Sequence, residues 1–330
     1  MLMKKTINFM TLAALAACLA LALPANAYDF ERYGIYYNIT GSNTVEVTYK
    51  DTNFNYYSGD ITIPSSVTYQ GVTYQVKAIG RMAFRGSPDL TGITIPNTVT
   101  SINYGAFYQC SSLAAVVIPN SVTLVDDFAF MSCTALSSVT IGNNVTFLGR
   151  QSFLRCTSLT QVTIPSSVRE ISYFAFYNCE SLASVTIQNG VETIQNSAFE
   201  SCTSLPTFSI PASVTTIAEA ALSECTSLSY IYVSSGNTHY RSQNGVLFTA
   251  ALDTLVAYPN MLGTDYQVPA GTRAITRGAF FGCDNLYSVT LPEGLTSIGE
   301  IAFQACDKLT TVHVPASVSE IGRASCRERV

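Results

Sequence analysis

The sequence is poor in charge and in the residues that most catalytic centres use. Charged residues make up 12% of its 330 residues, tryptophan is absent, and histidine occurs only at His239 and His313. Neither histidine has a serine, cysteine or carboxylate partner at a catalytic spacing, and phosphate-loop, zinc-protease and dinucleotide-binding motifs are absent. The net charge of -5 provides no basic footprint for nucleic acid. We therefore expect a protein that is not an enzyme, needs no cofactor or metal, and binds no nucleic acid.

The N-terminal segment has the features of a secretory signal peptide. Two lysines precede an apolar run from residue 7 to residue 23, and Ala25-Asn26-Ala27 supplies the small residues of a cleavage site. We expect residues 1–27 to be removed and the protein to be secreted or placed at the outer cell surface. Alternatively, Leu15-Ala16-Ala17-Cys18 is a lipobox, and a lipid on Cys18 attaches the protein to a membrane.

The last ten residues do not read as native protein. Residues 321–330 match the translation of a widely used sequencing adapter, so we expect them to be a non-native tail. The native C-terminus, with any membrane anchor or further domain after it, would then be missing from this sequence.

Most of the chain is built from an internal repeat of 23 residues. A single unit reads Ile118-Pro119-x-x-Val122-x-x-Val125-x-x-x-Ala129-Phe130-x-x-Cys133-x-x-Leu136-x-x-Val139-x-Ile141. The phenylalanine column comprises Phe84, Phe107, Phe130, Phe153, Phe176, Phe199, Phe280 and Phe303, with Leu222 continuing it. Because several columns repeat together, the repeat is the organising feature of the fold.

The spacing within one unit predicts a coil. Val139-x-Ile141 places two β-branched side chains on one face of a short strand, and the proline that follows most such strands ends them. Residues 122–133 have apolar side chains three and four positions apart, which is typical of a turn, a 3₁₀ turn or a short helical arc. One unit cannot bury its own apolar edge, so units must stack about 4.8 Å apart. We predict a β-rich repeat solenoid with one short parallel strand per coil.

The repeat resembles the BspA-like leucine-rich repeat, with which it shares Leu-x-x-Val-x-Ile-Pro and Ala-Phe-x-x-Cys. The resemblance covers roughly residues 61–320. It implies a leucine-rich repeat solenoid in a surface or secreted protein of a host-associated bacterium. It also implies partners such as host extracellular-matrix or cell-surface proteins, glycans or other microbes, and carries over no catalytic residues.

Interruptions of the period suggest the domain boundaries. Residues 28–60 read as an N-terminal β-hairpin that caps the first coil, followed by repeats in residues 61–233. A loop is expected near residues 68–74. Residues 234–267 exceed one period and read as a β-hairpin insertion that projects from the solenoid, before truncated repeats in residues 268–320.

Cysteine follows the same period, from Cys110 to Cys225 and again at Cys283 and Cys306. One cysteine per coil gives neighbours parallel Cα–Cβ vectors, whereas a disulfide needs Cβ atoms that face each other. Ser87 occupies the same column, so the position favours a small buried side chain. We therefore predict a column of packed thiols, with disulfides or a metal site as the alternatives.

The residues that flank the inward valine of each strand must point outward. They form a nearly uncharged face rich in threonine and serine, with aromatic residues at Tyr230 and Tyr232. Such a face is either an ordinary exposed sheet, for which threonine is well suited, or a docking surface. The candidate binding residues are Thr140, Gln161, Thr163, Thr186, Tyr230, Tyr232, Thr290 and His313.

These patterns favour a non-catalytic binding protein, an adhesin or a protein–protein interaction solenoid. The alternative is a structural surface scaffold that displays a missing C-terminal domain. Carboxylates are few and scattered, so no facing pair for glycoside hydrolysis is apparent.

Overall fold

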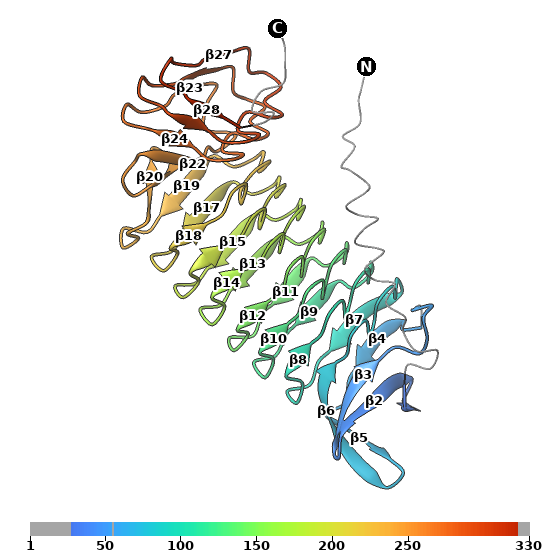
Figure 1. The fold of residues 1–330 in the computed structure, drawn as a ribbon. Helices are drawn as coiled ribbons and strands as arrows, with labels where there is room; N and C mark the ends of the chain where they lie inside the picture. The colour runs from blue at the N-terminus through green and yellow to red at the C-terminus, as the bar shows by residue number, and fades with distance from the viewer. Residues whose placement is uncertain (1–27, 55, 323–330) are drawn as a thin grey trace, which may run out of the picture.

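The computed structural model describes residues 28–54 and 56–322, so the predictions for residues 1–27, with Cys18, and for residues 323–330 lie outside it. The described residues form an elongated stack of coils, from the blue N-terminal end to the red C-terminal end in Figure 1. They contain 28 strands joined by turns and loops, and no helix. The predicted β-solenoid is confirmed.

Two rows of parallel strands run along the stack. The long row consists of β4 (Gly59–Thr62), β7 (Leu90–Thr94), β9 (Ala115–Val117), β11 (Ser138–Thr140), β13 (Gln161–Ile164), β15 (Ser184–Ile187), β17 (Thr207–Ile210), β19 (Tyr230–Val233), β23 (Asp265–Gln267), β25 (Ser288–Thr290) and β27 (Thr311–His313). The short row consists of β6 (Val72–Ile79), β8 (Ser101–Ile102), β10 (Leu124–Val125), β12 (Phe147–Leu148), β14 (Glu170–Ile171), β16 (Thr193–Ile194), β18 (Thr216–Ile217), β24 (Ala274–Ile275), β26 (Ser297–Ile298) and β28 (Glu320–Ile321).

Pairing follows the 23-residue period. In the long row Val162 pairs with Val185, and in the short row Val125 pairs with Leu148. Equivalent residues of successive coils therefore lie one above the other. The prediction of one strand per coil was wrong, because each coil also contributes a short-row strand. Most of these strands have only two residues, which is too short for an alternating sequence pattern.

The arc between the two rows consists of hydrogen-bonded turns. In the coil that contains Phe130, Phe128 and Ser132 both have a φ of 61°, on either side of the Ala129–Phe130 step. A left-handed residue at each end turns the chain without continuing into a helix. The Phe130 N–H donates to the Ser152 carbonyl of the next coil at 2.7 Å. The arcs thus add a third ladder of backbone hydrogen bonds to those of the two rows.

The phenylalanine column is the centre of the core. Ring centroids lie 5.0 Å apart between Phe107 and Phe130 and 5.1 Å apart between Phe130 and Phe153, with planes within 4° and 6° of parallel. All three rings are fully buried. This spacing matches the distance between neighbouring strands, so side-chain stacking and backbone pairing reinforce each other.

The cysteine column forms a ladder beside the rings. The Cys133 thiol donates to the Phe107 carbonyl at 3.1 Å, and the Cys156 thiol donates to the Phe130 carbonyl at 3.2 Å. Burial raises the pKa of Cys179 to about 12. The seven buried cysteines from Cys110 to Cys283 are free thiols. The predicted packed-thiol column is confirmed, and each coil gains a hydrogen bond to its neighbour that the sequence did not reveal.

The N-terminal cap comprises β1 (Phe30–Arg32), β2 (Ile35–Gly41) and β3 (Thr44–Thr48), joined antiparallel in that order. β3 then pairs in parallel with β6 of the first coil, and Val45 and Val47 are fully buried. The predicted hairpin cap is confirmed. The loop expected near residues 68–74 is instead the end of a hairpin between β5 (Ser66–Tyr69) and β6.

The insertion differs from the prediction. It forms three strands, β20 (Tyr240–Gln243), β21 (Val246–Thr249) and β22 (Thr254–Ala257), in an antiparallel meander. β22 pairs in parallel with β24, and the meander lies in line with the coils in Figure 1. The predicted hairpin is present as the antiparallel pair β21–β22, but the prediction that it projects from the solenoid was wrong. Val246, Leu247 and Phe248 are all fully buried, because this consecutive apolar run packs between the coils on both of its faces.

The last described coil keeps the register. Ile321 pairs with Ile298 one period earlier. That residues 321–330 are non-native stays a prediction.

Candidate functional site

Six of the eight candidate residues lie on one face of the long row. Thr140 is on β11, Gln161 and Thr163 are on β13, and Thr186 is on β15, where it pairs directly with Thr163. β17 lies beside β15 and pairs with β19, which contributes Tyr230 and Tyr232. All are exposed except Tyr230, which is half-buried. The valine or other apolar residue between them points into the core, so their outward orientation follows from strand alternation.

The other two candidates also lie on the long row, but further along the stack. Thr290 on β25 pairs with His313 on β27, and both side chains are exposed. Their strands belong to a separate sheet with β23, beyond the inserted meander. The structure therefore does not bring Thr290 and His313 together with the other six residues.

The exposed face between β9 and β19 is uncharged. The strands read AVV, SVT, QVTI, SVTI, TFSI and YIYV, so their outward positions carry hydroxyls, an amide, small apolar groups and two phenols. We name this surface the hydroxyl face. It offers hydrogen-bonding groups without a fixed charge, so a partner need not bring a compensating charge.

The two tyrosines at the end of the hydroxyl face form a close, tilted ring pair. Their ring centroids are 4.5 Å apart, and the planes are tilted by 35°. The Tyr230 ring packs over Gly245, where an added Cβ would lie 2.8 Å from a ring carbon. Gly245 also has a φ of 90°, a conformation that favours glycine. The inserted segment therefore holds Tyr230, and Tyr230 in turn supports Tyr232, whose side chain remains 52% exposed.

A surface cavity of about 260 Å³ lies beside this pair, at the ends of β15, β17 and β19. Tyr232 was predicted from the sequence as a binding residue, but the remaining lining residues were not. The lining consists of Ile187, Ser209, Ile210, Pro211, Tyr232, Val233 and Ser234. In the sequence, the only sign of this cavity is that the outward column changes from threonine and serine to tyrosine at Tyr232. The hollow itself could not be predicted, because the side chains of three successive coils form it.

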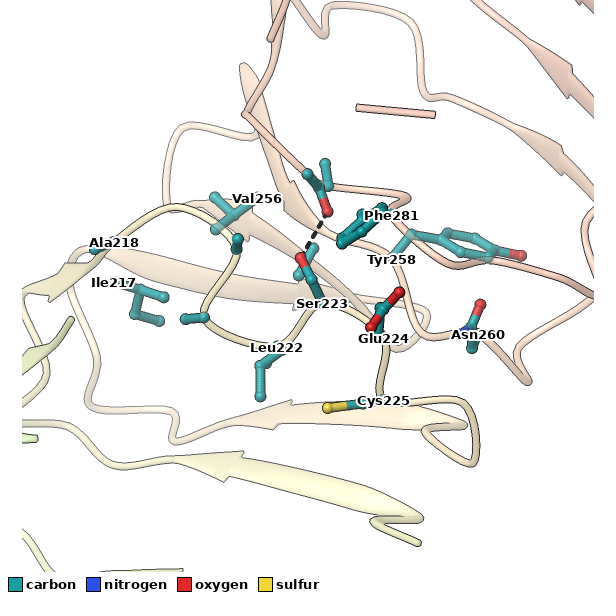
Figure 2. Close-up of a pocket in the computed structure, with 15 residues that line it drawn as sticks. Ile217, Ala218, Leu222, Ser223, Glu224, Cys225, Val256, Tyr258, Asn260 and Phe281 are labelled. Atoms are coloured by element: carbon teal, nitrogen blue, oxygen red, sulfur yellow. Dashed lines mark hydrogen bonds between the residues drawn. The ribbon is translucent and has the colours of Figure 1, made fainter. Parts of the chain in front are cut away.

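A second cavity lies at the junction between residues 217–225, 256–260 and 278–281 (Figure 2). Its volume is about 10 Å³, close to the space that one water molecule needs. The Ser223 hydroxyl donates to the Gly278 carbonyl at 3.1 Å, and burial raises the pKa of the Cys225 thiol to about 12. A neutral thiol is a poor nucleophile, so this junction offers packing rather than chemistry.

No helix in residues 28–54 and 56–322 has the length and apolar character that a membrane crossing needs. The same residues contain no group of three or more His, Cys, Asp or Glu side chains that could hold a metal ion.

The repeat now allows the family to be assigned. The BspA type leucine rich repeat region matches residues 60–172, 125–243 and 257–328, in six copies, and so covers well over half of the chain. The protein belongs to this family. No curated protein is significantly similar to the chain.

Several solved bacterial structures resemble this BspA type protein. A leucine rich cell surface protein from Faecalibacterium prausnitzii A2-165 is 27% identical with a TM-score of 0.70, covering 90% of this chain and 95% of that one. The pneumococcal vaccine antigen PcpA is 20% identical with a TM-score of 0.65, covering 88% and 70%. A leucine-rich repeat protein from Bacteroides ovatus is 22% identical with a TM-score of 0.50, covering 90% and 91%. The last two establish the fold alone, and the first adds similarity to a protein of the cell surface.

Proposed function

We propose that this protein is a non-catalytic binding protein, secreted or held at the outer cell surface, that acts as an adhesin. Its partner would dock on the hydroxyl face between β9 and β19. The observation that carries the proposal is the extent of this face. Strands β9 to β15 pair in register, β17 lies beside β15 and pairs in register with β19, and the outward side chains of all these strands are uncharged.

The chemistry of the hydroxyl face supports docking of a large partner. Threonine, serine, glutamine and tyrosine side chains provide donors and acceptors, and a regular β-surface loses little entropy when a partner binds. Extended repeat arrays commonly bind through such a surface. The likeness to a cell-surface protein of Faecalibacterium prausnitzii supports the location.

The family resemblance suggests host extracellular-matrix or cell-surface proteins, glycans or other microbes as partners. The full chain would be tested against immobilised matrix proteins and whole bacterial or epithelial cells, by surface plasmon resonance and cell-binding assays. We expect saturable binding to at least one of them. No binding by a protein that circular dichroism shows to be folded would contradict the proposal and favour the display scaffold.

A pair of charge substitutions localises the binding surface. Thr163→Glu places a carboxylate in the middle of the hydroxyl face, where Thr163 is exposed, and should weaken binding at least about tenfold because the partner must desolvate that charge. The matched control is Thr146→Glu, at an exposed threonine outside the long row. Equal losses in both variants, or none in Thr163→Glu, would place the interface elsewhere.

A further inference from the structure

The cavity beside Tyr232 is lined by the tyrosine ring, by apolar side chains and by two serines. Ile187 and Ile210 line it from strands β15 and β17 and are buried, with 8% and 1% of their surface exposed. Ser209 and Ser234 are exposed at the rim. Ser209 pairs with Tyr232 across the two strands, so a hydroxyl and a phenol ring stand side by side.

The wall of this cavity is held in place before any ligand arrives. Tyr230 is packed between Gly245 and the Tyr232 ring. The Ile231 N–H, between the two tyrosines, donates to the Gly245 carbonyl at 3.0 Å. The insertion thus fixes the strand from its free edge, and a ligand would lose little affinity to the ordering of Tyr232.

The charge of the lining narrows the class of ligand. All seven lining residues are uncharged, as are the outward positions of β13, β15, β17 and β19. An anionic or cationic group placed here would lose hydration without gaining a counter-charge. A wholly apolar ligand would leave the serine hydroxyls facing it unsatisfied. The chemistry therefore favours a neutral ligand that is apolar on one face and polar at its edge.

A pyranose sugar has this character. Its axial C–H groups form an apolar face that packs on an aromatic ring, while its hydroxyls project from the rim and bind side-chain hydroxyls. The volume of about 260 Å³ lies just below the usual range of about 300–1,000 Å³ for pockets that hold drug-sized ligands. It suits a single sugar ring better than a run of peptide.

We propose that this cavity binds one hexopyranose ring of a neutral oligosaccharide, stacked on Tyr232. The inference rests on the proposed binding function and names a ligand class within it. Tyr230 acts as a positioning residue that supports the Tyr232 ring through their ring contact. Ser209 and Ser234 contact the sugar hydroxyls.

The test uses the full chain and a panel of neutral gluco-, galacto- and manno-configured oligosaccharides, with sialylated and sulfated counterparts. The strongest neutral binder is then titrated by isothermal calorimetry. We expect binding of neutral oligosaccharides in preference to charged ones. Tyr232→Ala should reduce the affinity at least about tenfold, and Tyr232→Phe, which retains the ring, should change it less than about threefold.

Tyr287→Ala is the matched control, because Tyr287 is a tyrosine outside the hydroxyl face and is 46% exposed. It should leave sugar affinity within about twofold. The inference is overturned if no neutral oligosaccharide binds, if charged ones bind equally well, or if Tyr232→Ala and Tyr287→Ala behave alike.

The two proposals fail in different ways. Loss of a macromolecular partner in Thr163→Glu, without any oligosaccharide binding, would retain the proposed function and exclude the sugar site. Absence of every partner and every oligosaccharide would exclude both.

Discussion

Truncating one ring at the centre of the phenylalanine column should cost more than any surface change. Phe153 is fully buried and stacks on Phe130 at 5.1 Å and on Phe176 at 5.3 Å. Replacing a buried phenylalanine by alanine costs about 3–5 kcal/mol. Each lost ring pair adds about 0.5–1.5 kcal/mol beyond area burial, which favours the upper part of that range. We therefore expect Phe153→Ala to lower the free energy of unfolding by about 4–5 kcal/mol.

The measurement is urea unfolding followed by far-UV circular dichroism. Phe147→Ala provides a control of the same chemistry, because Phe147 lies six residues earlier on β12 with 45% of its surface exposed. We expect that control to cost less than about 1 kcal/mol. Equal costs for the two variants, or a loss of less than about 1 kcal/mol for Phe153→Ala, would show that the stacked rings do not form the core and would refute the reasoning.

Three further predictions address the thiols, the turns and the pH dependence. Iodoacetamide at about pH 8 should label half-buried Cys306 in the native protein. Cys179 should be labelled only after unfolding, because burial raises its pKa to about 12. Peptide mass spectrometry would measure the labelling of both cysteines. Gly105→Ala should cost about 1–2 kcal/mol in urea unfolding, because Gly105 has a φ of 59° and an added Cβ would lie 3.0 Å from the Met82 sulfur; an unchanged midpoint would contradict this. Burial raises the pKa of Glu200 above its ordinary value of 4.5, so the folded state binds a proton more readily than the unfolded state. Stability should therefore rise as pH falls through the raised pKa towards 4.5. Glu200→Gln should raise the Tm at neutral pH and reduce this gain on acidification, and calorimetry that finds the same pH profile for both proteins would contradict the assignment.

Much of the fold could be predicted because each short sequence pattern recurs at the same position in successive repeat units. A single Ala-Phe step predicts little, but the same step at a constant interval predicts that the rings of Phe107 and Phe130 stack. The cap lies outside the repeat and was predicted separately, from strand-forming residues on both sides of a turn. The short-row strands were missed, since two-residue strands such as Leu124–Val125 have no alternation to read.

The insertion shows where local pattern is insufficient. The sequence indicates the strands of residues 245–248 and 254–258, but whether they project or pack inward depends on the apolar edges that neighbouring coils leave open. Val246 and Phe248 fill that space, so the predicted hairpin forms as β21 and β22 but packs into the stack instead of projecting. Of the candidate surface, the sequence indicated which side chains face outward, but not how the strands that carry them are divided among three sheets.

The sequence alone determined the coil, its period, the inward columns and the outward threonines, because strand alternation and stacking act between residues at constant spacing. Tertiary structure alone decided that Thr290 and His313 lie apart from the other candidates. It also decided that Gly245 supports Tyr230, and that three strand ends form an open surface hollow beside Tyr232. The contact between Gly245 and Tyr230 arises where the repeat is interrupted, so no period predicts it. The hollow is lined at the repeat period, by Ile187, Ile210 and Val233 among others, but its shape depends on how the side chains of three coils pack in space.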